Sequence, residues 1–250
     1  MIKSAKEVEE IPIINDSDLV YSYKEQVFDG FAPCFQNGLY SLACCKGARN
    51  GNGMRQSICK AVEAGKTVWI LAIAATGIVS KDNNASGINY APGDAMYLAK
   101  IDHVCTWQEY SADKEYRKRA DSYYILENGE VIWRKAVKVR GKHDKWDDLE
   151  HDCALGEGNL KGRTVADVFR DDKQILIAHE YYVFDKGQQI SGKMPYEALD
   201  VRRGYKYVDK GRTSRTAVLR QFLQKNHAYY CVSGFNPFKD TVSIKGGSCK

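Results

Sequence analysis

The apolar run KTVWILAIAATGIV at residues 66–79 constrains the fold more than any other stretch of the chain. It is short and rich in β-branched residues, and its apolar part ends near Gly77, which predicts a buried central strand. Its 13 residues from Thr67 to Val79 are fewer than the roughly 20 that a membrane-spanning helix needs. The start of the chain carries charge where a secretory signal is apolar. We therefore expect a globular, cytoplasmic protein.

Other segments predict more strands and a few helices. The aromatic-rich opening at 19–46 is interrupted by Asp29-Gly30 and Asn37-Gly38, which indicates two short strands, and Asn128-Gly129 indicates a hairpin. Apolar residues at helical spacing predict helices at 54–64 and 213–227. Because helices and strands do not alternate regularly, we expect an α+β fold with a mostly antiparallel, barrel-like sheet and two or three flanking helices.

The domain organisation follows from what the sequence lacks. No internal repeat, low-complexity segment or Pro/Ser-rich linker divides the 250 residues. We expect an N-terminal extension at 1–18 and one domain at 19–250. The charged, glycine-containing stretch at 138–162 predicts a long surface loop or insertion.

Positive charge is concentrated late in the chain. The net charge is only +5, but basic residues gather between Arg202 and Arg220 with Asp209 as the single opposing charge. Such a patch suits phosphate or a nucleic-acid backbone, and the alternative is a solvated helix face. The residues that we predict to contact a nucleic-acid backbone are Arg202, Arg203, Lys206, Arg212 and Arg215.

The segment GLYSLACCKGARNGNG at 38–53 offers a candidate nucleophile and two cations. Cys44 and Cys45 are neighbours, so in a strand their side chains point to opposite faces and at most one enters a pocket. Lys46 and Arg49 could lower the pKa of Cys45 or bind a phosphate. The alternative is a buried thiol without chemistry, since free cysteine is among the most buried residue types.

His179 follows an apolar strand and is a candidate general base. A histidine at a strand end can move a proton when a carboxylate elsewhere fixes its tautomer. The adjacent Glu180 points to the other face of a strand and is not expected to be that carboxylate. A hydrogen-bonded structural histidine is the alternative.

Aromatic and charged side chains occur together in two segments. Tyr21, Asp29 and Phe31 lie in the first, and Arg119 and Asp121 lie in the second. Rings can stack on a nucleobase while polar groups read its edge, so we predict that these residues line a nucleotide pocket, with Asp121 also a catalytic candidate. Packing of the tyrosines in the core is the alternative.

A metal site is a weaker hypothesis. His143, His151 and Cys153 lie within one charged segment, but their spacing matches no established ligand pattern, and a solvated loop explains them as well. We predict no metal. The chain has no CxxC pair and no GxGxxG, GxxxxGK[ST] or GxSxG string, which removes the commonest zinc-ribbon, dinucleotide, P-loop and hydrolase signatures.

Several short motifs, taken in order, carry a resemblance to a known family. They are YSYK at 21–24, DGFAPCF at 29–35, SLACCK at 41–46, AGKTVWILAIAATG at 64–77, MYLAKI at 96–101, RADSYY at 119–124, ILIAHEYYVFDKG at 175–187 and RRGYKY at 202–207. With these motifs the chain resembles the nucleotide modification associated domain 2 family of bacterial and phage proteins. Where that family tends toward GDW before the central strand, this chain has Gly65-Lys66-Thr67. The strand pattern is also similar to pseudouridine synthase and archaeosine transglycosylase type base-binding folds.

The resemblance implies a nucleotide- or nucleobase-binding protein that takes part in DNA base modification. Nucleotide or DNA, and other base-modification enzymes, are then the expected partners, with no membrane involved. The resemblance supplies no reaction and no cofactor. Two other functions stay open, a non-catalytic reader of modified DNA bases and a metal-dependent nucleotide-processing enzyme.

Overall fold

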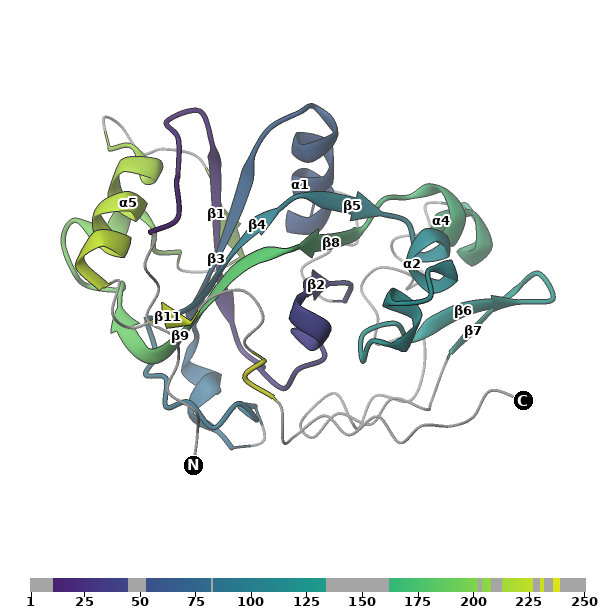
Figure 1. Ribbon diagram of the computed structural model, residues 1–250, viewed down its shortest axis with the longest axis horizontal. Helices are drawn as coiled ribbons and strands as arrows, with labels where there is room; N and C mark the ends of the chain where they lie inside the picture. Colours follow the sequence, from purple (N-terminus) through teal and green to yellow (C-terminus); the bar gives the residue numbers. More distant parts are fainter. Residues whose placement is uncertain are drawn as a thin grey trace.

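The computed structural model describes residues 11–44, 53–81, 83–133, 162–201, 204–207, 213–226, 230–231 and 236–238. Its centre is a six-stranded mixed sheet in the order β10-β1-β3-β4-β9-β11 (Figure 1). The strands are β1 (Leu19–Glu25), β3 (Val68–Ala74), β4 (Asp94–Ile101), β9 (Glu180–Gln189), β10 (Tyr205–Lys206) and β11 (Tyr230–Cys231). The β1–β3 pair is parallel and the other pairs are antiparallel.

Strand β3 confirms the predicted central strand. All seven of its residues are buried, because both faces of the sheet are covered. Val68 and Ile70 belong to one hydrophobic cluster, whereas Trp69 and Leu71 belong to a second cluster on the opposite face. Burial on both faces explains why the segment is apolar throughout rather than alternating.

The face that Trp69 points to is covered by the helix α5 (Arg215–Asn226), as Figure 1 shows. Phe222 and Leu219 are buried in the same cluster as Trp69. Ile14 also lies in this cluster, and Asp18 accepts a hydrogen bond of 3.0 Å from Trp69 Nε1. The segment before β1 is therefore part of the packed structure from residue 14 onward.

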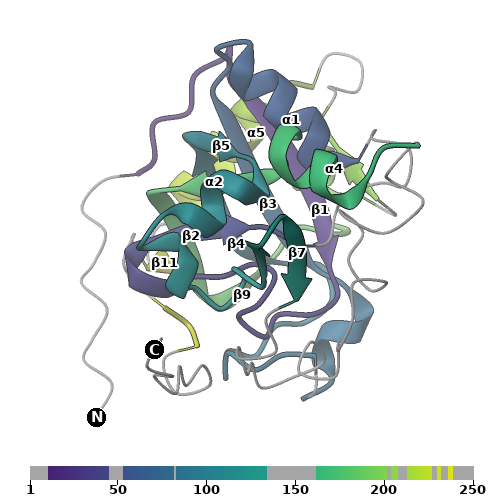
Figure 2. The ribbon, with the colours of Figure 1, turned by 90° about the vertical axis from the view of Figure 1, so that its right-hand side faces the viewer.

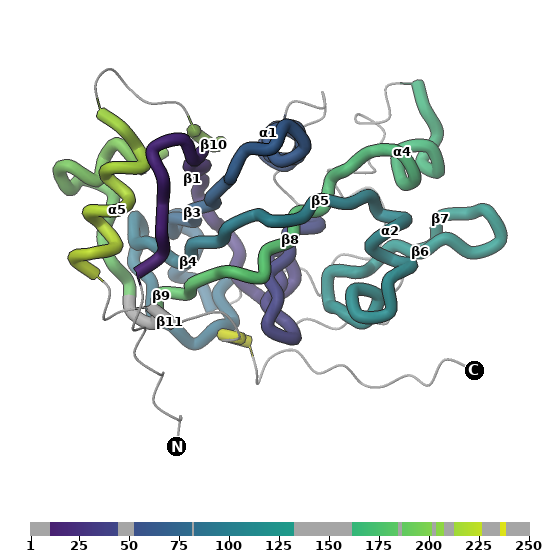
Figure 3. The backbone as a smooth tube through the Cα atoms, turned by 45° about the horizontal axis from the view of Figure 1, so that its top comes forward, coloured from purple at the N-terminus to yellow at the C-terminus, as the bar shows by residue number. Residues whose placement is uncertain are grey.

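The opposite face carries a second, smaller sheet in the order β2-β8-β5. Its strands are β2 (Tyr40–Leu42), β5 (His103–Cys105) and β8 (Ile175–Ala178). Only Asp102 separates β4 from β5, and only His179 separates β8 from β9, so two long chain segments run side by side through both sheets (Figure 3). Both segments change sheet at these two residues.

Helices and one hairpin complete this side of the molecule. The elements are α1 (Met54–Glu63), α2 (Trp107–Ala112), α4 (Val165–Asp171) and the hairpin of β6 (Tyr124–Glu127) and β7 (Glu130–Trp133). Helices α1 and α4 overlap in the view of Figure 2, but Figure 1 shows that they are separated along the long axis of the molecule. At the hairpin turn, Asn128 and Gly129 have positive φ angles of 52° and 84°, which Asn and Gly tolerate best and which an Asn-Gly turn requires.

The mixed α+β class is confirmed, but the barrel is wrong for the described residues. The sheet does not close, because it ends in two-residue edge strands, β10 and β11, on opposite sides. The described residues contain four α-helices where the sequence predicted two or three. The unexpected ones, α2 and α4, are six and seven residues long and begin at Thr106 and Thr164 with complete capping boxes. None of the helices that the structure describes is long and apolar enough to cross a membrane.

Candidate functional site

The site begins where the two long segments change sheet, because this junction brings Asp102 and His179 together. The Asp102 carboxylate accepts the backbone N–H of His179 at 2.8 Å. Both Asp102 oxygens lie 3.1 Å from Nδ1 of the His179 ring. The backbone contact fixes the position of the carboxylate, and the carboxylate in turn fixes the ring.

This arrangement leaves Nε2 as the ring nitrogen available to a ligand. A neutral imidazole with its proton on Nδ1, donated to Asp102, has an acceptor lone pair on Nε2. Nε2 of His179 forms no hydrogen bond within the part of the chain that the structure describes. The side chain of His179 is 69% exposed, so solvent and a ligand both reach it. Glu180 lies apart, bound to Lys100 at 3.1 Å and to the Tyr182 hydroxyl at 2.9 Å.

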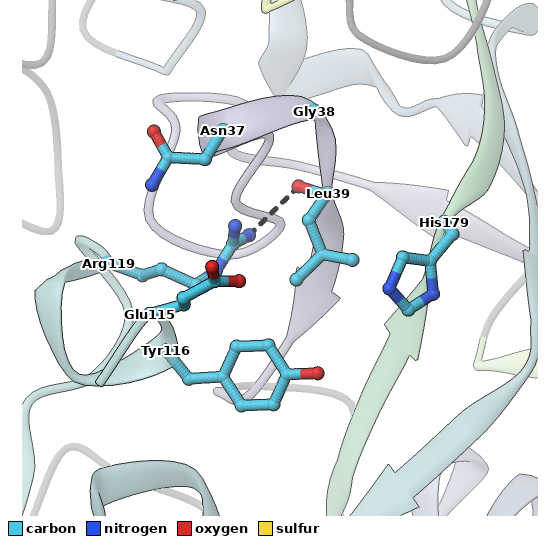
Figure 4. A pocket seen from close by; sticks show the side chains of 7 residues that line it. All are labelled: Asn37, Gly38, Leu39, Glu115, Tyr116, Arg119 and His179. Atoms are coloured by element: carbon cyan, nitrogen blue, oxygen red, sulfur yellow. Dashed lines mark hydrogen bonds between the residues drawn. The ribbon is translucent and has the colours of Figure 1, made fainter. Parts of the chain in front are cut away.

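His179 lies on the wall of a small pocket of about 100 Å³. Three parts of the chain form it: the turn η1 (Gln36–Gly38) with Leu39, the turn η3 (Tyr116–Lys118) with its flanking residues, and the β8–β9 junction (Figure 4). The lining residues are Asn37, Gly38, Leu39, Glu115, Tyr116, Arg119 and His179. Segments far apart in sequence thus meet at one end of the small sheet.

The rim of this pocket is polar. The side chains of Asn37, Glu115 and Tyr116 form no hydrogen bond to the described residues, and Figure 4 shows the Tyr116 hydroxyl pointing toward His179. Burial raises the pKa of the Tyr116 hydroxyl, with a smaller contribution from Asp113, so it stays a protonated donor at neutral pH. The rim therefore presents an amide, a carboxylate, a hydroxyl and an imidazole to any ligand.

Arg119 forms the floor of the pocket and is only 1% exposed. Its Nη2 donates to the carbonyl oxygens of Cys34 and Leu39 at 3.0 Å each, and Nη1 donates to that of Gln36 at 2.5 Å. Figure 4 draws the bond to Leu39. These three carbonyls belong to the loop that carries Asn37, so Arg119 holds the pocket wall in place.

Asp121 lies beneath Arg119 and is fully buried. Its carboxylate accepts hydrogen bonds from Ser41 Oγ at 2.5 Å and from the Tyr110 hydroxyl at 2.7 Å, and it lies 3.7 Å from Arg119 Nε. Burial by itself would lower the pKa of Arg119, but Cys34, Tyr110 and Asp121 raise it above its ordinary value. Arg119 therefore stays charged in this interior network.

The structure places the other predicted pocket residues elsewhere. Tyr21 is buried, and its hydroxyl shares a hydrogen bond of 3.0 Å with Ser57 Oγ. Its ring stacks on that of Tyr207, with ring centroids 4.7 Å apart. Asp29 is buried and accepts the backbone N–H of Phe31 at 3.3 Å. The ring of Phe31 lies 4.9 Å from that of Tyr123. Of the predicted pocket residues that the structure describes, Arg119 and His179 line the pocket in Figure 4 together.

Arg215 and Lys206 lie at the other side of the central sheet. Arg215 is 2% exposed and donates to the carbonyl oxygens of Val20, Ala198 and Lys206 and to Ser22 Oγ. Its guanidinium thus joins α5 to the sheet edge, where a phosphate would have to displace these acceptors. Lys206 is half-buried, and its ammonium donates to Ala198 O at 3.1 Å.

Several predicted residues lie outside the described part of the chain. They are Cys45, Lys46, Arg49, His143, His151, Cys153, Arg202, Arg203 and Arg212. Among the residues that the structure does describe, no group of three or more His, Cys, Asp or Glu side chains is arranged to hold a metal ion.

The sequence prediction missed Asp102, Tyr116 and Asn37 as site residues. A signal for Asp102 exists, because the polar pair Asp102-His103 interrupts the apolar strand pattern just as the pair His179-Glu180 does. Two strands that both step between sheets can meet at such interruptions. No comparable signal marks Tyr116, which is one of 16 tyrosines in the chain.

No family model matches the chain, and neither the curated proteins nor the solved structures include a significant match to it. The geometry of the pocket and the chemistry of its residues therefore carry the functional argument.

Proposed function

We propose that this protein binds a nucleobase, free or within a nucleotide or DNA, at the pocket of His179 and takes part in its modification. In this proposal His179 is the general base and Asp102 positions it. Tyr116, Glu115 and Asn37 read the polar edge of the base. The observation that carries the proposal is the contact of Asp102 with Nδ1 of His179, at 3.1 Å, beside a polar pocket.

The proton chemistry follows from the two ring nitrogens. Nε2 accepts a proton from an N–H or O–H group of the ligand, and the ring becomes an imidazolium with both nitrogens protonated. The Asp102 carboxylate stabilises that positive charge through the Nδ1–H donor. The proton can then return from Nε2 to a leaving group, so the dyad serves as base and then as acid.

The size of the pocket limits what enters it. Sites that enclose a whole drug-sized ligand measure about 300–1,000 Å³, whereas this pocket has about 100 Å³. It therefore holds one polar edge of a ring rather than a complete nucleotide. An amide, a carboxylate and a phenol together offer both donors and acceptors, which is what an edge with alternating donors and acceptors needs.

The sequence resemblance to the nucleotide modification associated domain 2 family supports the choice of a nucleobase over other polar rings. A reader of modified bases would use the same pocket without proton transfer. The two functions differ in one respect, since an enzyme loses turnover but keeps binding when the general base is removed.

The test compares H179A and D102N with H103A as the matched control. His103 is an exposed histidine next to Asp102, and it does not line the pocket. Nucleosides from cells that express each variant together with the genomic neighbours of this protein are analysed by mass spectrometry. We expect the modified nucleoside to be absent with H179A and its rate of formation to fall about 100-fold or more with D102N. H103A should leave its amount unchanged.

Nucleoside binding by the purified variants separates the two functions. If the wild-type protein binds a nucleoside but the cells that express it contain no modified nucleoside, the reader function is favoured. No binding of any common nucleoside, together with an unchanged profile, would refute the proposal.

A further inference from the structure

Besides Arg119 and Arg215, the interior contains a further buried arginine, Arg55, whose surroundings differ from theirs. Arg55 lies in the first turn of α1 and is fully buried. Its Nη1 donates to the carbonyl oxygens of Ala43 and Gln174, the latter at 3.0 Å. Within the part of the chain that the structure describes, its Nε and Nη2 have no hydrogen-bond partner and no carboxylate pairs with it. The charge is thus buried with three of its five N–H donors unused.

The two unused nitrogens form one edge of the guanidinium. The N–H bonds of Nε and Nη2 run parallel along this edge, which is the geometry that holds two oxygens of a phosphate or carboxylate. A buried charge without a partner is costly, and a buried donor without an acceptor adds to that cost. An oxyanion on this edge would remove both costs.

The helix supplies a second, independent set of donors at the same place. Helix α1 is ten residues long, and its N-cap is Gly53, so no side chain caps the first turn. The first backbone N–H groups of a helix have no acceptor within the helix, and together with the positive end of the helix dipole they favour an anion there. Side chains of a helix lean toward its N-terminal end, so the guanidinium of Arg55, the second residue of α1, lies on the side of the helix end and can share a ligand with it.

We propose that the N-terminal end of α1 and the Nε–Nη2 edge of Arg55 form a binding site for a phosphate-type oxyanion. This site does not depend on the nucleobase pocket. The two lie at opposite ends of the β2–β8 pair, with Leu39 and His179 at one end and Ala43 and Gln174 at the other. Four residue steps from Leu39 to Ala43 span about 13 Å at roughly 3.3 Å each.

The test measures thermal unfolding of the whole protein with inorganic phosphate, against potassium chloride at the same ionic strength. At ten times its Kd, phosphate should raise the Tm of the wild type by about 3–6 °C. R55M should show no such rise, whatever its Tm without phosphate, because it lacks the guanidinium edge that binds the oxyanion. K60M is the matched control, because it removes one exposed charge from the same helix and should respond as the wild type does.

A second variant covers the case in which R55M does not fold. R55K keeps the charge but replaces the forked edge with one ammonium group. Isothermal titration should give one phosphate per wild-type chain and at least tenfold weaker binding to R55K. Equal phosphate affinity of wild type and R55K, or an equal Tm rise in wild type and R55M, would overturn the proposal.

Two further ligands identify the source of the oxyanion and keep this site separate from the nucleobase pocket. If a nucleoside 5′-monophosphate displaces inorganic phosphate, the site is supported and its ligand is a nucleotide. If phosphate binds and the nucleotide does not compete with it, the site is supported and its ligand is free phosphate. A nucleoside without phosphate should bind R55K and wild type equally. H179A should bind phosphate normally, so failure of the nucleobase proposal leaves this result intact.

Discussion

Two buried arginines, Arg119 and Arg55, lie at opposite ends of the small sheet and have different surroundings. Arg119 has a buried carboxylate, Asp121, beside it and donates to three backbone carbonyls and two hydroxyls. Arg55 has two carbonyl acceptors and no carboxylate among the described residues. A guanidinium with an acceptor on each of its three nitrogens holds structure together, whereas one with an unused edge is arranged for a ligand. Burial alone does not distinguish the two cases.

The comparison also reassigns the predicted role of Arg119. The sequence predicted that Arg119 contacts a nucleotide, and the structure shows its donors turned toward the loop at 34–39. We therefore regard Arg119 as a positioning residue for the pocket. Arg55, for which the sequence predicts no role, has the unused donors on Nε and Nη2.

The largest expected effect is that of R119M. Removing the guanidinium leaves Asp121 buried without its counter-charge and leaves three carbonyls without a donor. We expect the free energy of unfolding to fall by about 3–5 kcal/mol in urea denaturation followed by tryptophan fluorescence. K118M, which removes an exposed charge from the adjacent turn, should change it by less than about 0.5 kcal/mol. If R119M lowers the free energy of unfolding no more than K118M does, Arg119 has no structural role that distinguishes it from Arg55.

A smaller effect is expected for D121N, which keeps the shape of the side chain. The amide loses the negative charge that faces Arg119 and half of the acceptor capacity used by Ser41 and Tyr110. We expect a loss of about 1.5–3 kcal/mol in the same denaturation experiment. The control is D171N on α4, an exposed partner of Arg163, for which a loss below about 1 kcal/mol is expected. If D121N is as stable as the wild type, the charge of Asp121 does not balance that of Arg119.

The smallest effect concerns one thiol near each arginine. Burial raises the pKa of Cys34 and of Cys59 from 9.0 to about 12, and the nearby Arg119 and Arg55, respectively, only partly oppose this rise. The folded state keeps these protons while the unfolded chain loses them, so stability falls as pH rises from about 9 toward 12. Between pH 8.0 and 9.5, each thiol should lower the free energy of unfolding by about 0.8 kcal/mol.

Denaturation of C34A and C59A over the same pH range tests this assignment. Each variant should lose its own share of the alkaline destabilisation, whatever its stability at pH 8. An unchanged pH slope in either variant would show that the thiol in question already titrates near its ordinary pKa in the folded protein.

Much of the fold could be predicted because local patterns specify it. The apolar run at 68–74, the apolar face of the helix at 215–226 and the Asn128-Gly129 turn each act through neighbours in the sequence. The barrel prediction failed because closure depends on which strands pair, and the parallel β1–β3 pair with two short edge strands is a long-range property.

The site was only partly predictable for the same reason. His179 was identified as a strand-end histidine that needs a distant carboxylate, but nothing local names Asp102, which lies 77 residues earlier. In the sequence, Tyr21, Asp29 and Arg119 were equally good candidates for one nucleotide pocket. Strand pairing places them at separate buried positions, and the sequence does not specify that pairing.

The sequence by itself determined the α+β class, the buried central strand and the helices α1 and α5, and it singled out His179 as a candidate, because these follow from residue type and short-range spacing. Only the tertiary structure decided which carboxylate holds that histidine, which arginine is satisfied and which is not. Those outcomes depend on contacts between segments far apart in the chain, where the acceptors around a buried donor are fixed by strand pairing and not by the donor's own neighbours.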